Sequence, residues 1–160
     1  MYPLAHLAAS LLLNEAYRGD RASAAAGALA PDITDKTLAW ALRVTPSGRF
    51  AAHSLAAAAA QTLVMVWLAG PRKGASFATS YLCHLVGDLW EGGHVPWLMP
   101  FRRYEYSDQR WNPEVTWGAL ALELVGMLLL TRLAARWAAE GKPRAGSSQA
   151  EGGTTDAEER

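Results

Sequence analysis

The sequence predicts an all-α protein, a bundle of four to five apolar helices that is embedded in a membrane or associated with one. First, 51% of the 160 residues are hydrophobic, and alanine-rich stretches dominate the chain. Second, long apolar segments alternate with short turns that contain glycine and proline. Third, no stretch alternates apolar and polar residues as strands do. The 15 basic and 15 acidic residues balance, which argues against a nucleic-acid partner because such proteins carry a basic excess.

The N-terminal third of the chain contains two predicted helices and one short helical turn. The first helix covers residues 3–17. The second covers residues 21–30, with Asp20 as its N-cap. We expect this helix to end before Pro31, because proline removes a hydrogen bond from a helix interior and clashes with the preceding turn. A mixed segment follows, and it contains a short helix over residues 36–43.

The rest of the chain contains the long helices and a polar tail. Long helices are predicted over residues 50–69, 74–90 and 114–139. Residues 1–140 are expected to form one helical, metal-binding domain. Residues 141–160 are rich in Gly, Ser, Thr and Glu, and such a composition cannot bury enough apolar surface to order itself. We therefore predict a disordered tail there.

Two apolar runs favour a membrane location. Residues 115–130 are interrupted only by Thr116 and Glu123, and residues 55–68 only by Gln61 and Thr62. Both runs are slightly shorter than the ~18–20 residues that cross a bilayer cleanly. The helix that contains residues 115–130 carries aromatic and basic residues near its ends that suit a membrane interface. They are Trp117, Arg132 and Trp137. A soluble bundle with fully apolar core helices is the alternative.

Histidine and aspartate residues recur near the ends of four successive helices. Imidazole and carboxylate together are ligands for zinc, manganese or iron. His84 and Asp88 are four residues apart, so a helix places both on one face. Ligands from facing helices can meet inside a bundle. The sequence therefore predicts a metal site formed by His6, Asp32, His53, His84 and Asp88.

Each of these residues also has a simpler interpretation. His84 and Asp88 could share an ordinary hydrogen bond, and Asp35 could cap the helix that begins at residue 36. If Asp35 does not bind the metal, it is the first candidate for a general base. Two further residues, Glu91 and His94, could complete the site or contact the substrate, and an exposed loop histidine is the alternative for His94.

Four short motifs follow one another in this chain: the early His6, GALAPDITDK at 27–36, GRFAAHSL at 48–55 and SYLCHLVGD at 80–88. In order and spacing they resemble the membrane-bound metal-dependent hydrolases, which include LexA-binding, inner-membrane-associated members. The pattern is more remotely similar to that of the zinc-dependent phospholipases C. Lys36 stands where many relatives carry a further histidine, so the resemblance implies one metal ligand fewer here.

The resemblance implies a location in the inner membrane and a metal-activated water that attacks a phosphoester or a lipid-like ester. It places the same five residues at the metal site and Asp35 beside them. Zinc is the expected ion, with manganese or iron as alternatives, and membrane lipid is the expected partner. Two other functions remain open: a non-enzymatic membrane adaptor or structural protein, and a soluble helical metal-binding module.

Overall fold

The computed structural model of the protein describes residues 3–45, 47–90, 95–105 and 117–140, without the side chain of Trp90. All regular secondary structure in these ranges is helical, which confirms the predicted all-α class. There are five α-helices: α1 (Pro3–Ala16), α2 (Arg21–Lys36), α3 (Leu55–Ala69), α4 (Pro71–Trp90) and α5 (Trp117–Glu140). The two short elements are a π-helix, η1 (Thr37–Ala41), and a 3-10 helix, η2 (Ala51–His53).

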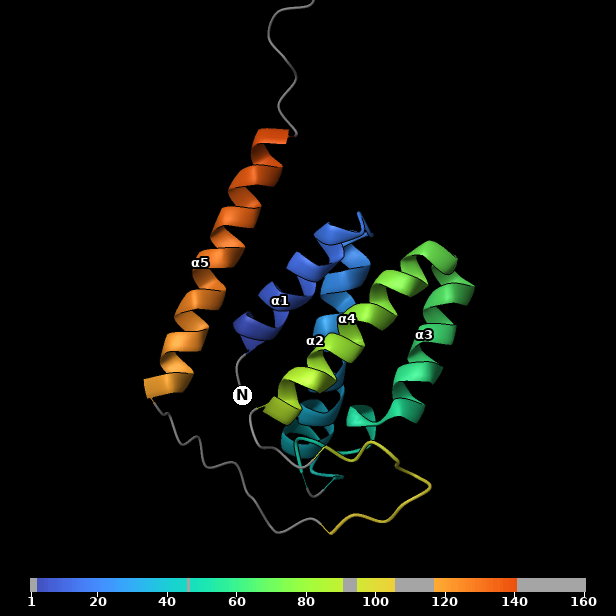
Figure 1. The fold of residues 1–160 in the computed structure, drawn as a ribbon. Coiled ribbons are helices and arrows are strands. Elements are labelled where there is room, and N and C mark those ends of the chain that lie inside the picture. The colour runs from blue at the N-terminus through green and yellow to red at the C-terminus, as the bar shows by residue number, and fades with distance from the viewer. Residues whose placement is uncertain (1–2, 46, 91–94, 106–116, 141–160) are drawn as a thin grey trace, which may run out of the picture.

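Helix α4 lies at the centre of the bundle, packed against α1, α2 and α3, while α5 lies on the outer side of α1 (Figure 1). The approach of α2 to α4 depends on Gly27. A Cβ atom at this position would lie 2.2 Å from the carbonyl oxygen of Phe77, so only glycine allows the two backbones to come this close. Two buried apolar clusters fill the bundle, one around Tyr81 and Leu85 and one around Leu11 and Leu133.

The turn between α1 and α2 is fixed onto α4. The Asp20 carboxylate accepts a hydrogen bond from Ser23 N at 2.8 Å, which confirms Asp20 as the N-cap of α2. The Asp20 amide donates in turn to Ser76 Oγ on α4, also at 2.8 Å. Arg18 has a left-handed backbone with φ of 55°, and this conformation reverses the chain between the two helices.

The predicted end of the second helix is wrong, because α2 continues through Pro31 to Lys36 and then into η1. Proline in a helix interior costs about 3 kcal/mol, and contacts made after it offset that cost. The Lys36 ammonium pairs with Asp32 one turn earlier, and Asp35 accepts backbone hydrogen bonds from the segment around η2. Both aspartates consequently lie inside a helix and not in the mixed segment that was expected to follow it.

The third long helix also starts later than predicted. His53 ends the separate helix η2, and α3 begins at Leu55. Ser54 has an extended backbone with ψ of 156°, and its hydroxyl accepts a hydrogen bond from Ala57 N at 3.1 Å. Ser54 is therefore the N-cap of α3, and His53 is free to turn inward on a separate short element.

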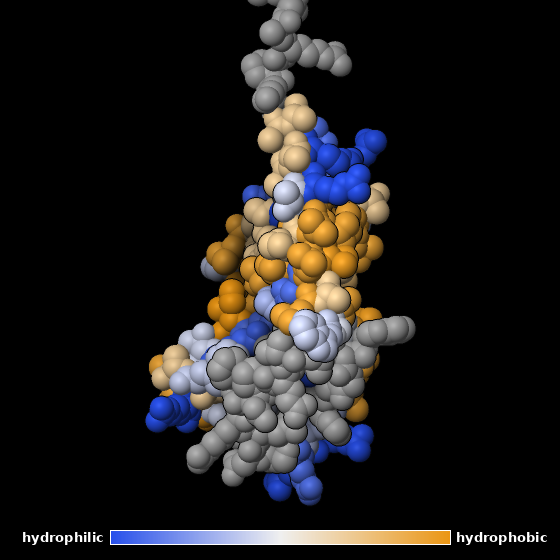
Figure 2. Space-filling view, turned by 90° about the vertical axis from the view of Figure 1, so that its left-hand side faces the viewer, coloured by the Kyte–Doolittle hydropathy of each residue, from blue (hydrophilic) through white to orange (hydrophobic). Residues whose placement is uncertain are grey.

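Among the described helices, α5 alone is both long and apolar enough to cross a membrane, and only 17% of its apolar stretch is buried. Figure 2 shows the side of the molecule on which α5 lies. Apolar residues cover much of it, and hydrophilic residues gather near the C-terminal end of α5. Glu123 in this helix accepts the backbone amide of Leu4 at 3.2 Å. It thus caps the N-terminus of α1. The expected tail at 141–160 lies outside the described residues.

Candidate metal centre

Six side chains from α1, α2, η2 and α4 meet in one buried region. Each is at most 8% exposed. We call this group the His/Asp cluster: His6 from α1, Asp32 and Asp35 from α2, His53 from η2, and His84 and Asp88 from α4. The structure therefore brings together all five predicted metal ligands and the predicted base.

Four atoms of the cluster surround one point. His53 Nε2 lies 3.2 Å from Asp88 Oδ2 and 3.5 Å from Asp32 Oδ1. His84 Nε2 lies 3.6 Å from Asp88 Oδ2 and 3.8 Å from Asp32 Oδ1. Zinc bonds of ~2.0–2.1 Å in tetrahedral geometry would separate neighbouring ligand atoms by about 3.3 Å. These four imidazole–carboxylate spacings are close to this value, and the ligand atoms of Asp32, His53 and His84 all lie within 4.8 Å of one another.

Among the described residues, none of these four atoms makes a hydrogen bond of normal geometry, although all four are buried. A buried polar group without a partner costs about 1–3 kcal/mol of folding free energy. Four such groups facing the same point would therefore destabilise the fold considerably if nothing bound between them. Asp32, His53 and His84 form a group that could hold a divalent metal ion, and an ion there would supply the missing partner for their buried atoms.

Asp35 makes a different set of contacts. Its carboxylate accepts backbone hydrogen bonds from Phe50, Ala52 and His53 at 2.6, 3.0 and 3.2 Å. His53 Nδ1 donates to the same group at 2.7 Å. Both carboxylate oxygens are thus occupied in holding η2 and the His53 ring. This arrangement leaves Nε2 of the ring for the centre of the cluster, as is typical of metal-bound histidines.

The other two aspartates each contact a cation with the oxygen that faces away from the centre. The Lys36 ammonium contacts Asp32 Oδ2, and Arg49 Nη2 donates to Asp88 Oδ1 at 2.6 Å. Lys36 and Arg49 are 18% and 21% exposed. They therefore form the partly exposed edge of an otherwise buried site, and they fix the two carboxylates so that their second oxygens point inward.

His6 lies against the other side of the cluster. Its ring centroid is 4.7 Å from that of His84, and its Nε2 is 3.9 Å from Asp88 Oδ1. His6, His84 and Asp88 form a second group whose ligand atoms lie within 4.8 Å of one another. The ring fits because residue 87 is glycine: a Cβ atom there would lie 2.5 Å from His6 Cε1.

The charges of the cluster favour a cation at its centre. Burial alone would lower the pKa of His53, but its contacts with Asp32, Asp35 and Asp88 outweigh burial and raise the pKa to about 10. Burial would raise the pKa of Asp88, but His53, His84 and Arg49 together hold it well below its usual range. Without a metal ion, a proton on His53 therefore supplies the positive charge that the carboxylates require.

Two predicted site residues are not described by the structure, and one residue of the site was not predicted. Glu91 and His94 lie outside the described residues. Arg49 was not identified as a site residue from the sequence, where it appeared only inside the motif at 48–55. Its contact with Asp88 joins residues 39 positions apart, and no local pattern signals such a pairing. The contact between Lys36 and Asp32, by contrast, has the i,i+4 spacing of a helical ion pair.

The fold and the cluster define a class: a helical protein with one candidate membrane-crossing helix and a buried His/Asp site that can hold a metal ion. Residues 1–145 match the family described as YdjM inner membrane protein. The chain belongs to this family and is a protein of the inner membrane. No curated protein and no solved structure matches the chain. Family membership confirms the predicted membrane location and argues against the soluble module.

Proposed function

We propose that the protein is a metal-dependent hydrolase of the inner membrane that acts on a phosphoester or lipid-like ester. The observation that carries the proposal is the set of four buried, unpartnered atoms around one point, from Asp32, His53, His84 and Asp88. When bound there, a divalent ion would act as a Lewis acid and lower the pKa of water toward neutrality.

Zinc is the ion that we propose. A ligand set of imidazole nitrogens and carboxylate oxygens suits zinc, whereas manganese and magnesium favour six oxygen-rich ligands. The cluster carries three carboxylates against the charges of Lys36 and Arg49. With His53 protonated in the metal-free state these charges sum to 0, and a divalent cation that replaces this proton would give +1, which favours an anionic substrate such as a phosphoester.

The protein's own residues divide the remaining tasks. Asp35 holds the His53 ring and η2 in place, and this positioning role fits its contacts better than the predicted role of general base. Lys36 and Arg49 lie at the partly exposed edge, where a phosphoester oxygen can approach them. His6 contacts the cluster from the side of α1, with its ring against His84 and its Nε2 3.9 Å from Asp88 Oδ1, and this position suits proton transfer or a further metal bond.

One observation favours a second function. Four protein ligands already complete a tetrahedral site, and closed sites of this kind are more often structural than catalytic. A metal ion held by Asp32, His53, His84 and Asp88 would join α2, η2 and α4. In that case the protein would be a non-enzymatic membrane protein whose fold depends on the ion. Catalysis instead requires expansion to five ligands or the loss of one carboxylate.

Metal content and hydrolysis distinguish these functions. The full chain would be purified in detergent, treated with a chelator, reloaded with zinc, and analysed for bound metal. The test variant combines His84→Ala with Asp88→Ala. The control is Ser80→Ala, one turn earlier on α4, where the hydroxyl is buried and has no hydrogen-bond partner. Chromogenic phosphodiester, phosphomonoester and carboxyl ester substrates would be offered to each protein.

We expect wild type and Ser80→Ala to bind zinc and to hydrolyse one ester class, and the double variant to do neither. Zinc binding without hydrolysis of any of these substrates would favour the structural role. Equal and negligible metal in all three proteins would refute the metal centre itself.

A further inference from the structure

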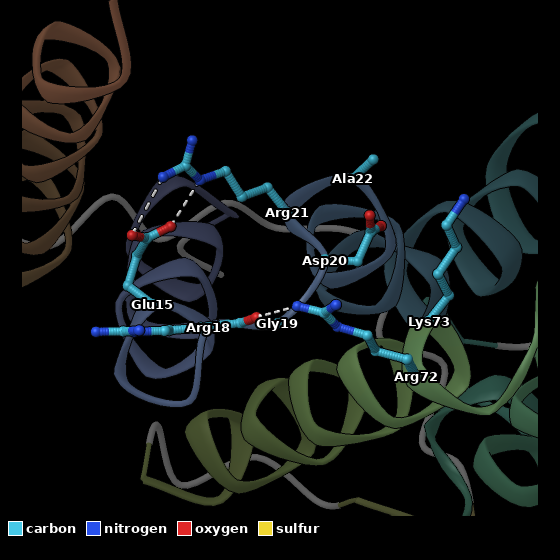
Figure 3. Close-up of a pocket in the computed structure, with 8 residues that line it drawn as sticks. All are labelled: Glu15, Arg18, Gly19, Asp20, Arg21, Ala22, Arg72 and Lys73. Atoms are coloured by element: carbon cyan, nitrogen blue, oxygen red, sulfur yellow. Dashed lines mark hydrogen bonds and ion pairs between the residues drawn. The ribbon is translucent and has the colours of Figure 1, made fainter. Parts of the chain in front are cut away.

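A charged cleft lies at the opposite ends of α1, α2 and α4 from the His/Asp cluster. Its volume is about 790 Å³, and the turn between α1 and α2 and the first turn of α4 form its walls (Figure 3). Its lining residues are Glu15, Arg18, Gly19, Asp20, Arg21, Ala22, Arg72 and Lys73. Four basic and two acidic side chains give the lining a net charge of +2.

Much of the acidic charge in the cleft is already engaged. Glu15 and Glu140 both pair with Arg21, at 2.7 and 3.0 Å. The Asp20 carboxylate is bound to the amide and hydroxyl of Ser23. Arg72 uses one guanidinium nitrogen to contact the carbonyl of Arg18, which leaves its remaining donors for a ligand.

Arg18 and Lys73 stay exposed, and within the described part of the chain neither side chain makes an ion pair. Hydrogen bonds from Ser23 and the nearby charges of Lys73 and Arg72 lower the pKa of Asp20, so this carboxylate offsets part of their charge. One carboxylate against the three cations Arg18, Arg72 and Lys73 still leaves positive charge, and an anion is the complementary ligand.

The position of the cleft points to a membrane ligand. Arg21 lies over the ring of Trp137 at 4.4 Å, so the last turns of α5 are attached directly to the cleft wall. Tryptophan and arginine near the end of a membrane-crossing helix mark the level of the lipid headgroups. Leu13 in the last turn of α1 and Tyr17, the residue that follows α1 and precedes Arg18 of the cleft lining, are each 43% exposed. Positive charge next to exposed apolar surface matches the two chemical parts of a phospholipid.

We propose that this cleft binds the phosphate headgroup of an anionic phospholipid, with Arg18, Arg72 and Lys73 as the contacts to the phosphate. Basic pockets beside membrane helices bind such headgroups. The acyl chains would lie along the exposed apolar side chains at the end of α1 and just after it, Leu13 and Tyr17. This site is separate from the His/Asp cluster and does not depend on metal binding or on hydrolysis.

Lipid binding to the detergent-purified full chain would be measured by native mass spectrometry, with phosphatidylglycerol and phosphatidylcholine titrated separately. The test variant is Arg18→Gln with Lys73→Gln. The control is Arg43→Gln with Arg103→Gln, which removes the same charge from exposed positions outside the cleft. Arg43 is a close match for Arg18 because its φ of 54° is almost the same as the 55° of Arg18.

We expect wild type and the control to bind phosphatidylglycerol at least about tenfold more tightly than phosphatidylcholine, and the test variant to lose about tenfold in phosphatidylglycerol affinity only. Added salt should weaken the preference. Equal affinity for the two lipids, or an unchanged affinity in the test variant, would overturn the proposal. So would displacement of the lipid by submillimolar inorganic phosphate at constant ionic strength, because the ligand would then be free phosphate.

Discussion

Asp35 and His53 are joined twice, through the side chain and through the backbone. His53 Nδ1 donates to Asp35 Oδ2 at 2.7 Å, and the His53 amide donates to the same oxygen at 3.2 Å. One carboxylate thus fixes both the short helix η2 and the direction of the ring at its end. Because Nδ1 is held in this way, the opposite ring nitrogen faces Asp32 and Asp88.

Replacing Asp35 by asparagine tests this positioning role. The amide group has nearly the same shape, but its nitrogen cannot accept the hydrogen bonds that the carboxylate accepts. Loss of such a partner typically costs about 10–100-fold in metal affinity, and we expect a decrease of that size for zinc. Competition with a chromophoric chelator measures it.

Asp20→Asn is the matched control, because Asp20 also accepts a backbone amide but does so at the far end of α2. Its zinc affinity should equal that of wild type. Wild-type affinity in Asp35→Asn would show that the carboxylate does not position His53 for metal binding.

Gly87→Ala tests the contribution of His6. The new methyl group would occupy space within 2.5 Å of His6 Cε1, so the imidazole must move away from His84 and Asp88. We expect zinc affinity to fall about tenfold, the lower end of the effect of such neighbours. Val86→Ala, at an exposed neighbouring position, should change little.

The double variant Gly87→Ala with His6→Ala separates this effect from general strain. If glycine acts only by admitting the ring, the double variant should bind zinc no more weakly than His6→Ala alone, since coupled residues are not additive. An additive loss would contradict that explanation.

The pH dependence of the chelator-treated protein follows from His53. Its pKa is raised to about 10 in the folded protein, against ~6.5 in an unfolded chain. The resulting stabilisation is fully present below pH ~6.5 and is lost as pH rises toward 10. We therefore expect the unfolding temperature of the metal-free protein to fall between about pH 6.5 and 10.

Asp88 acts in the opposite direction, because its lowered pKa stabilises the fold above pH ~4 and this contribution is lost on acidification. Thermal unfolding monitored by circular dichroism checks both limbs. His53→Gln should abolish the alkaline decrease, whereas a constant unfolding temperature from pH 7 to 10 in the metal-free wild type would rule out the protonated His53.

The membrane role of α5 is tested by placing a charge on its outer face. Leu124 is 52% exposed near the middle of the helix, and arginine there costs about 2.5–3.5 kcal/mol in a bilayer centre. Leu124→Arg should therefore reduce the fraction of protein that stays in the membrane after carbonate extraction. Ala135→Arg, beside Arg132 and Arg136, should not. Equal retention of both variants would argue that α5 does not span the bilayer.

The sequence predicted the helices and the members of the cluster because both depend on local patterns. Apolar segments between Gly- and Pro-rich turns located every long helix, and the i,i+4 spacing of His84 and Asp88 placed both on one face of α4. Their assignment as metal ligands stays a prediction, as does the identity of the ion.

Features that depend on distant contacts could not be predicted in this way. The continuation of α2 through Pro31 depends on Asp35 binding amides 15 to 18 positions away. The contact of Arg49 with Asp88 and the capping of α1 by Glu123 are also long-range. The basic cleft joins residues near 18 and near 72, and nothing in either segment alone indicates the other.

No member of the His/Asp cluster comes from α5, which packs on α1 and is attached at its two ends through Glu123 and Arg21. Anchoring and chemistry are thus separable along the chain. A polypeptide that stops before Trp117 would keep every side chain of the His/Asp cluster and would lack the apolar helix α5. Such a form would also expose Leu11 of α1, which Leu133 of α5 helps to bury, so it would need detergent or a polar substitution at position 11.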